Sequence, residues 1–137
     1  MNLAYYVLVF DAATDLLCEA IGFGAAHRRN ARTGVFVAET HTLYRTELLL
    51  GDQVRVWSQV IGADAKRIHL AHEMLRGDAP AAHQELMLLH VSLDTRRVAP
   101  FPPEVAAQVS AIATAHALLP RPGWLGRRVA MPAAAPA

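Results

Sequence analysis

The stretch LAYYVLVFDAATDLLCEAI, residues 3–21, decides the fold of this chain. Its apolar residues recur at steps of three and four, the spacing of one face of an α-helix: Tyr6, Phe10, Ala13, Leu17 and Ile21. Asn2 is a good N-cap for this helix, and Gly22 is a good stop. Polar residues form only a thin line along it, made of Asp11, Asp15 and Glu19. The sequence therefore predicts a long helix that other structure encloses.

Four segments that follow the helix have the alternating apolar pattern of β-strands. They lie at about 35–47, 53–62, 66–76 and 82–94, after a polar connection over 23–34. Turn residues separate the second strand from the first at Gly51-Asp52 and the fourth from the third at Gly77-Asp78. Because the connections between these long segments are short, the sequence predicts an antiparallel meander.

The composition changes near residue 100. Prolines open the segment FPPEVAAQVSAIATAHALL, residues 101–119, as they often open a helix. The Pro-, Ala- and Arg-rich residues 120–137 are expected to form an extended, partly disordered tail. One helix, a run of strands and a second helix predict a single α+β domain over residues 1–119.

Composition and charge restrict the possible partners and the compartment. The 137 residues are 53% hydrophobic and carry a formal net charge of +1, which argues against binding to nucleic acid or to a membrane surface through charge. Cys18 is the single cysteine, so no disulfide can form within the chain and a cytoplasmic location is favoured. The acidic residues of the first helix argue against a membrane span, and no signal peptide is expected.

An ordered set of motifs resembles the hotdog-fold acyl-CoA thioesterases, the relatives of 4-hydroxybenzoyl-CoA thioesterase. The set is M-N-x-A-Y-Y at the helix start, then E-x-H-x-x-Y, then L-x-G-D-x-V-x-V, and the resemblance covers roughly residues 1–103. The segments IGADAKRIHLAHEML, ELMLLHVSLDTRRVAPFPPEV and PRPGWLGRRV are similar to thioesterases associated with carnitine and betaine catabolism.

The resemblance implies a curved antiparallel sheet around a central helix, here residues 3–21. It implies homodimers, or homotetramers built from them, with active sites at the dimer interface. The expected reaction is hydrolysis of an acyl-CoA to free acid and CoA, with no metal and no cofactor beyond the CoA of the substrate. A short polar acyl group is expected, such as the quaternary-ammonium betainyl or carnitinyl group.

The sequence departs from the family pattern at its start. Many relatives have a strand before the helix that ends in D-x-x-G-H-M-N, and its aspartate is their usual catalytic carboxylate. The sequence given begins at the Met1-Asn2 of that motif, so this strand, its aspartate and its histidine are absent from it. A non-catalytic acyl-CoA-binding or assembly module therefore stays open as an alternative. A hotdog dehydratase is less well supported because the helix has no histidine, and a small α+β ligand-binding domain outside the hotdogs is a further alternative.

Two groups of residues are candidates for the chemistry. Asn2 caps the helix, and the nearby N–H groups of Leu3, Ala4 and Tyr5 could hold the thioester oxygen as it becomes an oxyanion. Glu39 and His41 share one face of their strand, where the two could orient a water molecule. Either group also has a plain structural interpretation, as a helix cap or as a buried polar pair.

Further residues are candidates for substrate contact. Tyr5 and Tyr6 could line the acyl pocket or pack in the core, and Tyr44 should point to the face opposite Glu39. Arg67 and His69 share a face and could meet CoA phosphates, although solvated side chains are the simpler interpretation. In the first strand, Glu39 and His41 are expected to share their face with Val35, Val37 and Leu43. A spacing of three sends His69 and His72 to opposite faces of a strand, so no metal site is expected.

Overall fold

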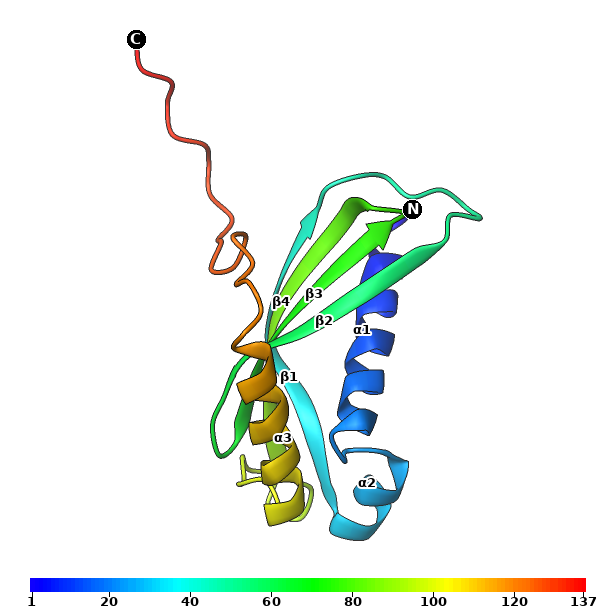
Figure 1. Ribbon diagram of the computed structural model, residues 1–137, viewed down its shortest axis with the longest axis vertical. Helices are drawn as coiled ribbons and strands as arrows, with labels where there is room; N and C mark the ends of the chain where they lie inside the picture. The colour runs from blue at the N-terminus through cyan, green and yellow to red at the C-terminus, as the bar shows by residue number, and fades with distance from the viewer.

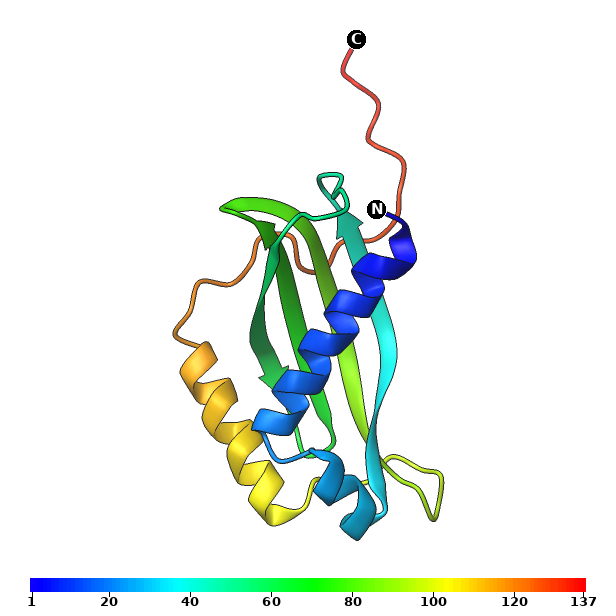
Figure 2. The same ribbon diagram turned by 90° about the vertical axis from the view of Figure 1, so that its right-hand side faces the viewer.

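A computed structural model describes all residues, 1–137, as three helices and one four-stranded antiparallel sheet. In chain order the elements are α1 (Leu3–Ala20), α2 (Ala25–Ala31), β1 (Thr33–Tyr44), β2 (Val54–Ala63), β3 (Arg67–Arg76), β4 (Ala79–Ser92) and α3 (Pro103–His116). Helix α1 crosses one face of the sheet. Helix α3 lies at the β2 edge of the sheet, near the C-terminal half of α1 (Figure 1, Figure 2). The predicted α+β class is confirmed, and α2 is a short helix within the segment expected to be a connection.

Helix α1 forms as the sequence predicts, but the single chain encloses it on one side only. Asn2 caps it, because the Asn2 side-chain oxygen accepts the Ala4 N–H at 3.1 Å. Its buried stripe has the spacing of one helix face and consists of Tyr6, Phe10, Thr14 and Cys18. Leu8 and Leu16 on the outward side are 61% and 69% exposed. In one chain, the sheet therefore covers one side of α1 and leaves the other side exposed.

The strand order corrects the predicted meander. Strands β2, β3 and β4 follow one another as neighbours, but β1 pairs with β4 at the opposite edge, giving the order β1-β4-β3-β2. Residues 45–53 carry the chain across from one edge to the other, past the N-terminal end of α1 (Figure 2). This crossover loop is anchored by Leu48, which is buried, and by the Tyr6 hydroxyl, which donates to Thr46 O and accepts from Leu48 N.

A β-bulge in β1 reverses the alternation of its side chains between the two faces of the sheet. The pairing with β4 shifts between Val37 and Glu39, so Val37 lies opposite Leu88 whereas Glu39 lies opposite Met87. Leu88 belongs to the core beneath the helices, and Met87 points to the other face. The extra residue therefore reverses which face the following side chains occupy. The expectation that Glu39 and His41 share a face with Val35 and Val37 is wrong for this reason.

The core has two parts, both between the helices and the sheet. The larger joins the C-terminal end of α1 and the inner side of α3 to strands β2, β3 and β4, and it includes Cys18. The smaller lies under the first half of α1, around Phe10 and Met74. Gly22 ends α1 with a φ of +100°, a conformation that favours glycine, which lets the chain turn beside Val105.

A buried histidine links three elements beneath α1. The His72 ring nitrogens lie 2.8 Å from Ser58 Oγ (Nδ1) and 2.9 Å from Thr14 Oγ1 (Nε2). Thr14 donates its hydroxyl hydrogen to Phe10 O at 3.0 Å, so its oxygen accepts from His72 Nε2–H. His72 Nδ1 then accepts from Ser58. This arrangement suits a neutral imidazole, and burial lowers the pKa of His72 to about 4.

The C-terminal segment packs against the sheet before it leaves it. After α3 the chain crosses to the other face of the sheet, where Trp124 stacks on His83 with ring centroids 4.5 Å apart. The Gly126 N–H donates to Glu85 at 2.7 Å. We call residues 118–127 the C-terminal strap. Only the last residues run away from the sheet, as predicted for the whole tail (Figure 1). No helix has both the length and the apolar character that a membrane crossing requires.

The neutral His72 makes stability depend on pH. An unfolded histidine takes up a proton below about pH 6.5, whereas His72 in the folded chain stays neutral down to about pH 4. Protonation therefore favours the unfolded state as the pH falls through this window. We expect the free energy of unfolding to decrease by up to about 3 kcal/mol between pH 6.5 and pH 4. Urea unfolding at a series of pH values measures this decrease.

Variants identify the group responsible. His72→Gln should flatten most of the slope, leaving a smaller contribution from His83, whose pKa burial also lowers. His41→Gln removes an imidazole but keeps the chain of hydrogen bonds through His72, so it should keep the slope. An unchanged slope in His72→Gln would contradict this account.

Candidate functional site

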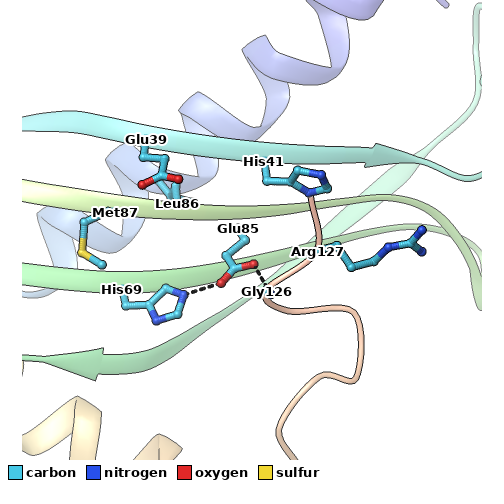
Figure 3. Close-up of a pocket in the computed structure, with 8 residues that line it drawn as sticks. All are labelled: Glu39, His41, His69, Glu85, Leu86, Met87, Gly126 and Arg127. Atoms are coloured by element: carbon cyan, nitrogen blue, oxygen red, sulfur yellow. Dashed lines mark hydrogen bonds and ion pairs between the residues drawn. The ribbon is translucent and has the colours of Figure 1, made fainter. Parts of the chain in front are cut away.

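The predicted site residues fall into two groups on opposite faces of the sheet. Asn2, Leu3, Ala4, Tyr5, Tyr6 and Tyr44 gather at the N-terminal end of α1. Glu39, His41 and His69 gather on the face away from α1, which we call the outer face (Figure 3). In one chain, the helix cap and the Glu39–His41 pair therefore do not form a single site.

Some of the backbone N–H groups at the N-terminal end of α1 already donate hydrogen bonds within the chain. The Ala4 N–H is held by the Asn2 side chain, and the Tyr5 N–H donates to Asn2 O at 3.0 Å. The Met1 amino group donates to Leu48 O at 2.6 Å, which ties the helix start to the crossover loop. The Asn2–Ala4 bond is exposed, so a substrate oxygen can replace the Asn2 oxygen there. Of the three N–H groups expected to bind an oxyanion, Tyr5 is the least available.

One pocket of about 240 Å³ opens beside this helix end and has aromatic walls. We call it the aromatic pocket; it is lined by Met1, Leu3, Tyr6, Tyr44, Arg45, Thr46 and Glu47. The Tyr6 and Tyr44 rings meet edge to face, with centroids 5.2 Å apart. Tyr44 therefore lies on the helix side, opposite Glu39, as predicted. Tyr6 is buried and hydrogen-bonded to the crossover loop, so the core interpretation of Tyr6 is the one that the structure supports.

A second pocket, of about 440 Å³, opens on another side of the helix start and is more apolar. Its walls are Met1, Asn2, Tyr5, Leu48, Leu49 and Leu50. Tyr5 is 58% exposed, so its ring is available as a wall rather than as part of the core. The two pockets share Met1, which places the N-terminal turn of α1 between them. The two pockets therefore lie next to each other at the helix start.

The outer-face pocket, of about 270 Å³, is a cluster of titratable groups (Figure 3). His69 Nε2 lies 2.7 Å from Glu85 Oε1, and the other Glu85 oxygen accepts the Gly126 N–H. Glu39 and His41 approach this pair from the neighbouring strand β1, and Arg127 of the strap lies at the rim. The cluster can exchange protons, but its Glu85 is already fully engaged with the strap and His69.

Arg67, the remaining candidate, does not line any of these pockets. It forms an ion pair with Asp64 at 2.6 Å, and this contact holds the pKa of the Asp64 carboxyl below its ordinary value. The predicted contact with CoA phosphates therefore has to compete with an existing partner. No three His, Cys, Asp or Glu side chains in the chain are grouped so that they could hold a metal ion.

Sequence reasoning missed several residues of these pockets, and three of them show why. Glu47 lies in a loop, where no periodicity marks a side chain, although it follows Tyr44 by one short turn. Glu85 alternates with apolar residues in β4, and that alternation could have placed it on the outer face with His69. Gly126 has no signal in the sequence because its role is a backbone contact of the strap.

Comparisons with known proteins show which proteins this chain resembles in sequence. The chain is 44% identical over 131 residues to the betainyl-CoA thioesterase of Pseudomonas aeruginosa, covering 94% of this chain and 82% of that protein. It is 37% identical over 133 residues to the L-carnitine dehydrogenase/betainyl-CoA thioesterase of Ruegeria pomeroyi, covering 97% of this chain but only 27% of that longer protein.

Solved structures share the fold. A Staphylococcus aureus protein, whose structure was determined in complex with CoA, superposes with a TM-score of 0.91 at 28% identity, covering 96% of this chain and 84% of its own. The DHNA-CoA thioesterase of the same organism superposes with a TM-score of 0.71 at 17% identity, over 83% and 81% of the two chains. The predicted hotdog fold is thus confirmed. Residues 1–109 match the thioesterase-like superfamily, and the chain belongs to that superfamily.

Proposed function

We propose that this chain hydrolyses a short acyl-CoA that carries a quaternary ammonium group, with betainyl-CoA as the representative substrate, to the free acid and CoA. The observation that carries the proposal is the 44% identity to a betainyl-CoA thioesterase over 94% of this chain. The two pockets that flank the start of α1 support it, because they offer separate room for an acyl head group and for the arm of CoA.

The thioester carbonyl is proposed to lie at the N-terminal end of α1. A helix N-terminus carries a partial positive charge and free N–H groups, which stabilise the negative charge that develops on a carbonyl oxygen under attack by water. Leu3 and Ala4 supply the nearest N–H groups, with Asn2 as the cap that the oxygen displaces. The reaction consumes water only, and CoA takes part as the leaving group of the substrate, so no further cofactor is proposed.

Glu39 and His41 are proposed to have no part in attack on a thioester held at Asn2 of the same chain. The bulge in β1 turns both side chains to the outer face, and the sheet separates that face from α1. A general base must be within hydrogen-bond reach of the water that it activates. The outer-face cluster therefore fits a role in structure, where Glu85 and the strap hold His69.

Self-association is proposed as part of the function. The outward side of α1 exposes a row of apolar side chains at helical spacing, namely Tyr5, Leu8 and Leu16. Strand β1 is an edge strand with free backbone groups beside this helix. A second copy that covers both would bury the exposed row and close the pockets at the helix start. We also propose a cytoplasmic location, supported by the single buried cysteine, Cys18.

The activity is tested by release of free thiol from a panel of acyl-CoA substrates. We expect betainyl-CoA to be cleaved with a higher kcat/KM than acetyl-CoA or a long-chain acyl-CoA, because the aromatic pocket is small and carries an acidic side chain. Saturable binding of betainyl-CoA without thiol release would instead support the non-catalytic acyl-CoA-binding module.

A substitution of Glu39 tests the position of the chemistry. We expect Glu39→Gln to keep kcat within about threefold of the wild type, because its carboxylate lies on the outer face. Loss of a general base typically costs about 10²-fold or more. A loss of that size, measured in the same thiol-release assay, would return Glu39 to the mechanism and contradict the proposed location.

The oligomeric state tests the exposed face of α1. Light scattering coupled to size-exclusion chromatography should give at least about twice the 14.9 kDa mass of one chain. Leu8→Asp should shift the protein to the monomer, because it places a charge in the apolar row. Val129→Asp, a similar change at an exposed tail residue, should not. A wild-type monomer at high protein concentration would refute self-association.

A further inference from the structure

The aromatic pocket holds one aromatic ring in a fixed and accessible position. Tyr6 is anchored by two hydrogen bonds to the crossover loop, 3.1 Å to Thr46 O and 3.0 Å from Leu48 N. The Tyr44 ring packs against this anchored ring edge to face, at an interplanar angle of 83°, and remains 43% exposed. Its position is thus set by its neighbour while part of its surface stays open to a ligand.

The same pocket contains a carboxylate with no partner in the chain. Glu47 lines the pocket, is exposed, and forms no ion pair or side-chain hydrogen bond. The ion pairs of the chain use other acidic residues, namely Asp52, Asp64, Glu73, Asp78, Glu85 and Asp94. Glu47 thus places an unpaired carboxylate in the same pocket as an exposed aromatic ring.

Arg45 also lines this pocket, and its charge opposes a bound cation. Burial is the main reason why the pKa of His83 lies below its ordinary value; Glu73 opposes this effect, and the charge of Arg45 adds to it. Arg45 therefore acts on His83, which lies on the outer face beneath Trp124. Glu47 is the one carboxylate among the residues that line the pocket, so it is the group that can offset the charge of Arg45 there.

We propose that the aromatic pocket binds the quaternary ammonium of the acyl group, with the Tyr44 ring and the Glu47 carboxylate as the residues that determine this specificity. A trimethylammonium group has no N–H to donate, so a protein can recognise it only through an aromatic face and through charge. The pocket volume of about 240 Å³ lies below the range of about 300–1,000 Å³ that is typical of sites for whole small molecules. It therefore suits a head group rather than a nucleotide.

The location of the pocket agrees with the chemistry of such a substrate. In a betainyl thioester a single methylene joins the ammonium to the carbonyl carbon, so the cation site and the reaction site must be adjacent. The aromatic pocket includes Met1 and Leu3 of the helix start, where the carbonyl is proposed to lie. This inference rests on the proposed function, and it adds the residues that select the charged acyl group.

The decisive comparison uses two substrates of the same shape. Betainyl-CoA and 3,3-dimethylbutanoyl-CoA differ in having a positively charged nitrogen or a neutral carbon at the centre of three methyl groups. We expect the wild type to prefer the charged substrate in kcat/KM. Glu47→Gln should lower this preference about tenfold, and Tyr44→Leu should lower it by about fivefold to tenfold.

Two further variants separate recognition from general damage to the protein. Tyr44→Phe retains an aromatic face and should retain most of the preference that Tyr44→Leu loses. Glu104→Gln makes the same chemical change as Glu47→Gln at the start of α3, at the opposite end of the molecule (Figure 2), and should leave the preference unchanged. The proposal would be overturned if Glu47→Gln lowered kcat/KM equally for both substrates. It would also be overturned if Glu47→Gln and Tyr44→Leu both left the ratio of the two kcat/KM values unchanged.

A binding measurement makes the test independent of turnover. Saturation-transfer NMR of tetramethylammonium with the full chain should show saturable binding that Glu47→Gln weakens at least about fivefold, whereas Glu104→Gln does not. Failure of thiol release with intact, Glu47-dependent binding would contradict the proposed hydrolysis but support the cation site. Thiol release from betainyl-CoA without any dependence on Glu47 or Tyr44 would support the proposed hydrolysis but contradict the cation site.

Discussion

The contact between Tyr6 and the crossover loop is the constraint on which the rest of this structure depends. Tyr6 lies in the first turns of α1, and its hydroxyl is bonded to Thr46 and Leu48 of the loop that carries the chain from β1 to β2. Because these two strands lie at opposite edges of the sheet, the loop must pass the end of the helix. A buried hydroxyl without these partners would cost about 1–3 kcal/mol, so the contact fixes the helix start and the loop together.

The same contact builds the site. With the loop fastened, Leu48 is buried against the helix, and the residues on either side of it are left at the surface. Tyr44 and Glu47 then lie on one side of the helix end, and Leu49 and Leu50 lie on the other. Two pockets of different character thus arise from one short segment. Their shared boundary is the N-terminal turn of α1, where partial positive charge is available for a carbonyl oxygen.

Local patterns in the sequence predicted most of the elements, because spacing and capping are local properties. The long helix with its cap at Asn2, the four strands within a few residues, and the C-terminal helix were all predictable in this way. The resemblance of the motifs added the hotdog fold. The partner of β1 was not predictable from short connections, because pairing with β4 joins residues that are about fifty positions apart. The strap was missed because its contacts at Trp124 and Gly126 depend on groups of the sheet.

The bulge near Val37 accounts for the error in the predicted facing of Glu39 and His41 relative to Val35 and Val37. Alternation along a strand is a sound rule as long as each residue has one partner, and a single extra residue reverses it for all that follows. Glu39 and His41 were correctly expected to share a face with each other, but that face is not the one beside α1. Of the predicted residues, those at the helix start remained together because a helix turn and its cap do not depend on strand register.

The chain pairs many of the polar groups of its sheet but not all of them, since His83 Nδ1 and His90 Nε2 are buried without a partner. On the outer face, His69 is paired with Glu85, and Glu85 is held by the strap. Beneath α1, the neutral His72 uses both of its ring nitrogens. The helix start is different, because it presents an unpaired carboxylate, an exposed aromatic ring and a replaceable cap in one small region. The partial positive charge of the helix N-terminus lies in the same region and favours a developing oxyanion, so this combination supports placing the chemistry beside α1.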